Sequence, residues 1–120
     1  MKLANRRILV VEDEPLIAWE LTTLLAQEGA IPLGPVQTVE AALRLVEKEP
    51  IDCAILNVEL RGEKSYPVAE VLTKKRVPFA FVTEYDDSVI PEPFRDRPIV
   101  EKPFIDRRAI QTIAELCNAK

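Results

Sequence analysis

Apolar and polar positions along the chain follow two periods, one typical of buried strands and one typical of amphipathic helices. Short apolar runs of strand length recur, and we expect strands at 7–11, 31–36, 51–57, 77–83 and around Ile99-Val100. Between these runs, apolar residues recur at helical spacing. This pattern predicts helices from Pro15 to the turn at Gly29, from the N-cap Thr38 to Pro50, from Pro67 to Lys75, and from Asp106 to Ala119. The apolar stripe of the first helix consists of Leu16, Ile17, Leu21, Leu24 and Leu25, and the residues of the last helix expected to face inward are Ile110, Ile113, Ala114 and Leu116. We expect a loop containing Gly62 after the strand at 51–57.

Repeated strand–helix units predict an α/β fold with a doubly wound parallel sheet and helices on both faces. The segment 86–98 breaks this rhythm, because Pro91, Pro93 and Pro98 leave room for at most one helical turn. We therefore expect a reduced fourth helix. No repeat, linker or low-complexity segment divides the chain, so we expect one domain over residues 1–120 and no output domain.

Composition narrows the function classes. The 120 residues are 48% hydrophobic and 30% charged, as in a soluble globular domain, and the net charge of −4 disfavours a nucleic-acid partner. Met1-Lys2-Leu3 leads directly into a polar stretch, so we expect no signal peptide, and no apolar run has the roughly 18 residues that a membrane span needs. Cys53 and Cys117 fit no metal spacing, and we expect reduced thiols in or near the core rather than a disulfide, consistent with the cytoplasm.

Polar side chains follow the ends of four predicted strands. Glu12 and Asp13 follow the first, Asn57 ends the third, Thr83 ends the fourth, and Lys102 comes just after the fifth. In a doubly wound sheet ligands bind at the carboxyl ends of the strands, so these residues should converge on one spot. Paired carboxylates suit Mg²⁺, and a hydroxyl with an ammonium group suits a bound phosphoryl group.

With these residues in place, the chain resembles the receiver domains of two-component response regulators over essentially its whole length. The resemblance is carried by Val10-Val11-Glu12-Asp13-Glu14-Pro15, Leu56-Asn57-Val58-Glu59-Leu60, Phe81-Val82-Thr83 and Lys102-Pro103-Phe104. It implies a flavodoxin-like, five-stranded parallel sheet of order 2-1-3-4-5. The stretch 78–85 resembles a stand-alone alphaproteobacterial class whose fourth helix is also reduced.

The resemblance also implies a metal site and a phosphoacceptor. Asp13 would bind Mg²⁺ directly and Glu12 largely through water, while Glu59 would offer its backbone carbonyl. Position 57 should be the aspartate that accepts the phosphoryl group, but here it is Asn57, and an amide has no anionic oxygen to attack a phosphoryl donor. Since one carboxylate is lost from the metal set of Glu12, Asp13, Asn57 and Glu59, we expect Mg²⁺ binding to be weak or absent.

Of the family's positions around the phosphoryl group, two match here and two differ. Thr83 would be the switch hydroxyl and Lys102 would contact the phosphoryl group. Glu84 stands where a small residue is usual, and its charge would repel a phosphoryl group. Ile99 stands where many receivers have an aromatic switch residue, although an aliphatic residue is frequent in the stand-alone class.

These features predict a stand-alone receiver-like regulator that acts by protein–protein interaction and is not phosphorylated at Asn57. Two alternatives stay open: an ordinary phosphoacceptor carrying an engineered aspartate-to-asparagine change, and a metal or small-ligand sensor. An enzyme is not expected, since the chain lacks histidine, a P-loop and a nucleophile–base pair. Expected partners are a histidine kinase, a phosphotransfer protein or another regulatory protein, and a homodimer is a further option. Trp19, Tyr85 and Phe94 are candidates for the partner surface. The alternative for Trp19 is partial packing against the last helix, and the alternative for Tyr85 and Phe94 is core packing.

Overall fold

The computed structural model describes residues 3–83, 99–101 and 107–118 of the 120-residue chain. Seven strands and four helices lie within this part of the chain. In chain order they are β1 (Arg7–Val11), α1 (Pro15–Gln27), β2 (Ile31–Val36), α2 (Val39–Lys48), β3 (Cys53–Asn57), β4 (Glu59–Leu60), β5 (Glu63–Lys64), α3 (Tyr66–Lys74), β6 (Phe79–Thr83), β7 (Ile99–Glu101) and α4 (Arg107–Cys117). The expected reduced helix at 86–98 lies outside the described residues.

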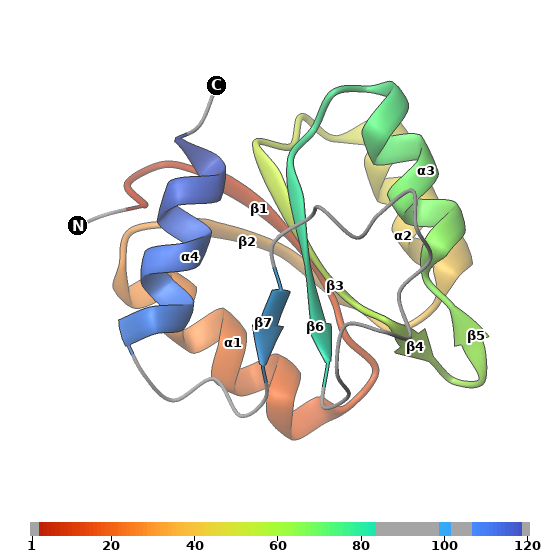
Figure 1. Ribbon diagram of the computed structural model, residues 1–120, viewed down its shortest axis with the longest axis horizontal. Coiled ribbons are helices and arrows are strands. Elements are labelled where there is room, and N and C mark those ends of the chain that lie inside the picture. The colour runs from red at the N-terminus through yellow and green to blue at the C-terminus, as the bar shows by residue number, and fades with distance from the viewer. Residues whose placement is uncertain (1–2, 84–98, 102–106, 119–120) are drawn as a thin grey trace.

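The central sheet has five strands in the order β2-β1-β3-β6-β7, and each neighbouring pair is parallel. Because β6 and β7 are the fourth and fifth strands of this sheet, the predicted order 2-1-3-4-5 is confirmed. Figure 1 shows α1 and α4 on one face of the sheet and α2 and α3 on the other. The fold is therefore the doubly wound α/β arrangement that the sequence predicts.

Strand residues alternate between two apolar layers, as the two-residue period of a strand requires. In β3, Cys53 and Ile55 belong to the cluster formed with α1 and α4, whereas Ala54 and Leu56 belong to the cluster formed with α2 and α3. All five residues of β3 are buried, so this strand lies at the centre of the molecule. Its last residue, Asn57, is consequently held by a rigid element.

Local sequence signals explain several boundaries. Thr38 caps α2, because its hydroxyl accepts a hydrogen bond of 3.1 Å from the backbone of Ala41. Gly29 follows α1 with a φ of 89°, a left-handed conformation that glycine adopts without a steric penalty. Both predictions are confirmed.

The segment after β3 was expected to be a loop containing Gly62, and this expectation was wrong. Residues 59–64 form a short antiparallel hairpin, β4–β5, in which Glu59 pairs with Lys64 and Leu60 with Glu63. Its turn places Arg61 and Gly62 at φ values of 48° and 86°. The run is too short for an alternating pattern, so periodicity could not indicate it.

The predicted strands at 51–57 and 77–83 begin two residues too early, since β3 starts at Cys53 and β6 at Phe79. Asp52 precedes β3 and contacts the neighbouring strand β1 through its side chain. Its carboxylate accepts a hydrogen bond of 2.8 Å from the backbone N–H of Arg7. The last helix matches better. Its predicted inward residues, Ile110, Ile113, Ala114 and Leu116, are all buried.

Cys53 and Cys117 are joined by a disulfide, so the prediction of two reduced thiols was wrong. The side chain of Cys53 leaves β3 on the face that α4 covers, and the two Cα atoms lie 5.5 Å apart. A sequence separation of 64 residues gives no sign of this proximity. It follows from the packing of the last helix over the first residue of the central strand.

No helix in the described part of the chain is long and apolar enough to cross a membrane.

Candidate functional site

Glu12, Asp13 and Asn57 meet at the carboxyl edge of the sheet. Strands β1 and β3 run side by side in parallel with Val11 opposite Leu56, so the next residue of each chain segment, Glu12 and Asn57, comes out beside the other. Glu12 is 2% exposed and Asn57 is 8% exposed. The predicted convergence of these side chains is therefore confirmed by their contacts.

The Asn57 amide faces both acids. Its Nδ2 atom donates hydrogen bonds of 3.1 Å to Glu12 Oε2 and of 3.1 Å to Asp13 Oδ1. Since both neighbours are acceptors, only the nitrogen of the amide can face them favourably. One amide group thus bridges the two carboxylates of the β1–α1 loop.

Asp13 is also held from a second direction. Its Oδ2 atom accepts a hydrogen bond of 3.0 Å from the backbone N–H of Arg61 in the β4–β5 hairpin. Burial raises the pKa of the Asp13 carboxyl, but hydrogen bonds from the backbone of Arg61, from its own backbone and from the Asn57 amide, together with the interaction with the Glu12 side chain, outweigh burial and lower this pKa below its ordinary value. The anionic form of Asp13 is therefore the one that the site stabilises.

Glu12 anchors the start of the loop. Its Oε2 atom accepts from the backbone N–H of Glu14 at 3.1 Å in addition to the Asn57 amide. The first residue of α1, Pro15, has no N–H to satisfy, and it continues the chain directly into the helix. The carboxylate of Glu12 consequently fixes the path of the chain between β1 and α1.

These residues do not fit Mg²⁺ well as they are arranged. The ion prefers oxygen ligands in octahedral geometry, but Asn57 directs N–H groups at Glu12 and Asp13. Among the described residues, no group of three or more His, Cys, Asp or Glu side chains could hold a metal ion. The amide hydrogens fill the space between the carboxylates in which a shared cation would be bound.

Glu59, the fourth predicted metal residue, turns its side chain elsewhere. Its carboxylate forms an ion pair with Lys64 across the β4–β5 hairpin. Both side chains are about half exposed, at 49% and 50%, so this pair adds little stability. The role expected for Glu59 concerned its backbone carbonyl and stays a prediction.

The switch residues are placed by strand register. Asn57 pairs with Val82, and Thr83 is the next residue of β6, so its backbone lies at the same edge of the sheet as the acids. Ile99 pairs with Phe81 on β7, further from that edge. Lys102, Glu84, Tyr85 and Phe94 lie outside the described residues, and their predicted roles stay predictions.

Helix α1 presents two large apolar side chains to solvent. Leu16 and Trp19 are 75% and 65% exposed and lie three residues apart on one face of the helix. The apolar stripe predicted for this helix included Leu16, and there the prediction was wrong. Leu21 and Leu25 are buried, so the packed face of α1 is rotated away from Leu16. Trp19 keeps about a third of its surface covered, so a partner contact and partial packing against the last helix both stay predictions.

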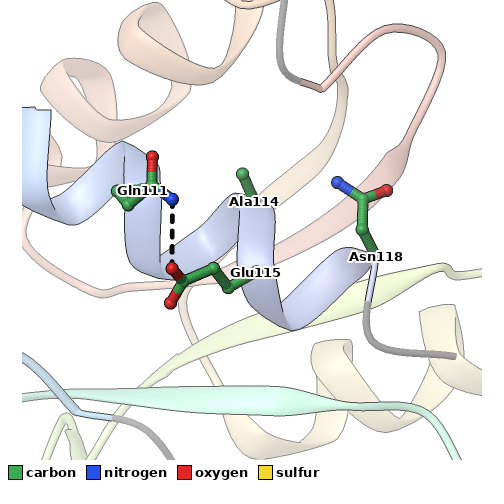
Figure 2. A pocket seen from close by; sticks show the side chains of 4 residues that line it. All are labelled: Gln111, Ala114, Glu115 and Asn118. Atoms are coloured by element: carbon green, nitrogen blue, oxygen red, sulfur yellow. Dashed lines mark hydrogen bonds between the residues drawn. The ribbon is translucent and has the colours of Figure 1, made fainter.

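A pocket of about 320 Å³ lies elsewhere, on α4. Figure 2 shows its four lining residues on one side of this helix, Gln111, Ala114, Glu115 and Asn118. Asn118 accepts a hydrogen bond of 2.6 Å from Arg6, just before β1, and so lies toward the amino ends of the strands. The pocket therefore extends away from the acidic site.

The sequence analysis missed Arg61. Its backbone N–H binds Asp13, and its guanidinium group binds the side chain of Gln37 in the β2–α2 loop. The left-handed φ of 48° turns this residue toward the site, although it is not a glycine. The only available signal was Gly62 directly after it, which indicates a turn but not its direction.

The chain belongs to the response regulator receiver domain family, whose model matches residues 8–114. This assignment agrees with the sheet order and with the acidic pair at the carboxyl edge. Receiver domains are signalling domains of two-component systems, and the chain is therefore a receiver of that kind.

Two solved structures and one curated relative illustrate the similarity. The solution structure of SdrG from Sphingomonas melonis Fr1 is 46% identical, with a TM-score of 0.83, and the match covers 97% of this chain and 98% of that one. The BeF3-activated conformation of SdrG, from Pseudomonas melonis Fr1, is 45% identical with a TM-score of 0.78, over 92% of this chain and 98% of that one. The sensory transduction protein LytT of Bacillus anthracis is 32% identical in an alignment of 119 residues that covers 95% of this chain and 48% of LytT. The chain thus spans about half the length of this relative.

Proposed function

We propose that the chain is a receiver that works by protein–protein recognition without phosphorylation at position 57. The observation that carries the proposal is the pair of hydrogen bonds from Asn57 Nδ2 to Glu12 and Asp13. In this arrangement the amide takes the place of a cation, because its N–H groups donate hydrogen bonds to both carboxylates and hold them together. It also cannot form an acyl phosphate, since its carbonyl oxygen carries no negative charge to attack phosphorus.

The amide holds the loops around the site in one arrangement. Asn57 fixes Glu12 and Asp13 at the start of α1, and Asp13 in turn fixes the β4–β5 hairpin through Arg61. Three chain segments are thus tied together without a metal or a phosphoryl group. A partner would meet one constant surface, whatever the supply of phosphoryl donor.

We propose the exposed face of α1 as that partner surface. Leu16 and Trp19 lie close in sequence to Asp13, at the end of the helix nearest the site. Exposed tryptophan side chains are enriched at the centres of protein interfaces. The proposed partner is a histidine kinase or a phosphotransfer protein, which this chain would occupy without accepting a phosphoryl group.

The test compares the natural chain with Asn57→Asp in Mg²⁺ and acetyl phosphate, followed by intact mass. SdrG, 45% identical, is described in a BeF3-activated conformation, so beryllofluoride is a second probe. We expect the natural chain to stay unmodified in both reagents. Asn118→Asp is the matched control, because it introduces the same charge at an exposed asparagine directly after α4.

Either outcome for Asn57→Asp is informative. If it gains a phosphoryl group readily, the remaining site residues are competent and Asn57 alone blocks the chemistry. If it stays unmodified, the site has diverged at further positions, such as Glu84. A phosphoryl group gained by the natural chain at position 57 would overturn the proposal.

A further inference from the structure

The two cysteines join elements that are far apart in the sequence. Cys53 is the first residue of β3 and Cys117 is the last residue of α4, 64 residues later. Both are buried, at 0% and 1% exposure, in the apolar cluster shared by β3, α1 and α4. They are the only cysteines of the chain, so each has one possible intramolecular partner.

We propose that Cys53 and Cys117 form a redox-sensitive lock that fastens α4 to the central sheet when oxidised and releases it when reduced. This inference does not depend on the chemistry of Asn57. It rests on the Cα–Cα distance of 5.5 Å, on burial, and on the position of each residue within its element.

The two ends of the bond differ in rigidity. Cys53 lies in the middle of the sheet, opposite Ile8 of the neighbouring strand β1. Cys117 lies in the last turn of α4, beside the exposed Asn118, and terminal turns of helices open more readily than strands in a core. Opening of this turn would expose Cys117 first and then uncover Cys53. The burial of the closed pair therefore slows exchange without preventing it.

The chemistry needs an external thiol–disulfide couple, for which a small disulfide such as oxidised glutathione suffices. The Cys117 thiolate attacks one sulfur of the small disulfide, forms a mixed disulfide and releases one small thiolate. The Cys53 thiolate then attacks the Cys117 sulfur and releases the second. Two electrons pass from the protein to the small disulfide, and the two protein protons pass to the two small thiolates. A dithiol or excess small thiol reverses both steps.

Without the bond, α4 is attached by weaker contacts. Its apolar residues pack into the shared cluster, and Asn118 accepts a hydrogen bond from Arg6. The same cluster contains Leu21 and Leu25 of α1, as the placement of both helices on one face of the sheet in Figure 1 suggests. The lock would therefore control the rigidity of the layer that α1 and α4 form.

The test uses the full chain equilibrated over a series of reduced-to-oxidised glutathione ratios, quenched with acid, alkylated and measured by intact mass. We expect one transition between a doubly alkylated form and an unalkylated form whose mass is two hydrogens below that of the reduced chain before alkylation. A chain that stays doubly alkylated at every ratio, or that accumulates only mixed disulfides with glutathione, would overturn the proposal.

Hydrogen exchange then separates a lock from a passive bond. We expect amides of α4 to exchange about tenfold or more slowly in the oxidised form, while amides of α2 on the opposite face exchange equally in both forms. The amides of α4 in Cys117→Ala should exchange like those of the reduced chain, in oxidising and in reducing buffer. If this variant does not fold, the oxidised and reduced forms of the unsubstituted chain can still be compared with each other. Equal exchange of α4 in both forms would overturn the proposal.

Discussion

The side-chain nitrogen of Asn57 lies 3.1 Å from Asp13 Oδ1, so an amide N–H joins the end of the central strand to the loop before α1. The same nitrogen lies 3.1 Å from Glu12 Oε2. An aspartate at position 57 would place a third carboxylate against these two and would remove both hydrogen bonds. Residue 57 therefore decides whether the site is complete by itself or requires a cation.

Asn57→Asp should make the fold dependent on a divalent cation. Two unit charges at ~4 Å repel by on the order of 4 kcal/mol at an effective dielectric of ~20, before relaxation. We expect thermal unfolding in EDTA at a temperature several degrees lower than that of the natural chain, with recovery in Mg²⁺. The natural chain should respond little to Mg²⁺.

The control for this prediction is Asn118→Asp, which adds the same charge at a side chain that already accepts from Arg6. Asn118→Asp should unfold at nearly the same temperature as the unsubstituted chain, both in EDTA and in Mg²⁺. Tighter Mg²⁺ binding by the natural chain than by Asn57→Asp, measured by titration calorimetry, would contradict the proposed role of the amide.

The acid dependence of stability should report on Asp13. Since the folded-state pKa of this carboxyl lies below its ordinary value, the ionised group stabilises the fold at pH values above its unfolded pKa of about 4. This contribution should be lost as the pH falls through the lower, folded-state pKa. In urea unfolding at a series of acidic pH values, Asp13→Asn should therefore flatten the decline in the free energy of unfolding.

Glu63→Gln on the exposed hairpin removes one carboxylate without touching the site and is the matched control. If Asp13→Asn and Glu63→Gln change the pH dependence equally, Asp13 makes no special contribution to it.

Gly34 should tolerate no side chain. Its φ is 99°, and an added Cβ atom would lie 2.7 Å from the backbone nitrogen of Val36 and 2.9 Å from the carbonyl oxygen of Val10. We expect Gly34→Ala to lower the free energy of unfolding by roughly 3 kcal/mol or more, because rigid backbone must move. Gly62 has a similar φ of 86°, but a Cβ atom added there would meet no atom within 4 Å. Gly62→Ala should therefore lower the free energy of unfolding by only about 1–2 kcal/mol. Equal losses in chemical denaturation would show that the close contacts at Gly34 relax without cost.

The sequence predicted the sheet and the meeting of the acids because each depends on local pattern and parallel topology. Strand length, helix period and the rule that parallel strands end at one edge suffice to bring Asp13 beside Asn57. The Cys53–Cys117 bond was missed, because it depends on the exact rotation of the last helix over the sheet. Leu16 was misplaced for a similar reason: the apolar residues of α1 cover a wide arc, and period alone does not say which edge of the arc faces solvent.

The contact between Asp13 and the backbone of Arg61 could not be predicted from the sequence, for a different reason. A backbone N–H is present at every residue except proline, so only the turn geometry of the β4–β5 hairpin selects this one. Residue type therefore indicated the acids of the site but not the donor that holds Asp13 from the second side.

The exposed pair on α1 should contribute to binding and not to stability. Because Leu16 and Trp19 are 75% and 65% exposed, replacing either with alanine removes few internal contacts. We expect changes in the free energy of unfolding within about 0.5 kcal/mol for each variant. If α1 meets a kinase or phosphotransfer partner, Trp19→Ala should weaken binding by about tenfold or more, as truncation of a central interface tryptophan does.

Trp19 is the only tryptophan of the chain, so its fluorescence measures this binding directly. Its emission in the free protein should lie near that of a solvated indole and be quenched by acrylamide, and a partner that covers α1 should shift it to shorter wavelength and protect it. Ile31→Ala is the matched control, since Ile31 is an exposed apolar residue, 42% accessible, on strand β2. Because Trp19→Ala has no tryptophan, binding by both variants is compared by titration calorimetry. Loss of binding in Trp19→Ala with normal binding in Ile31→Ala would locate the partner on α1. Equal binding by both variants, with Trp19 still accessible to acrylamide in the complex, would exclude this face of the helix.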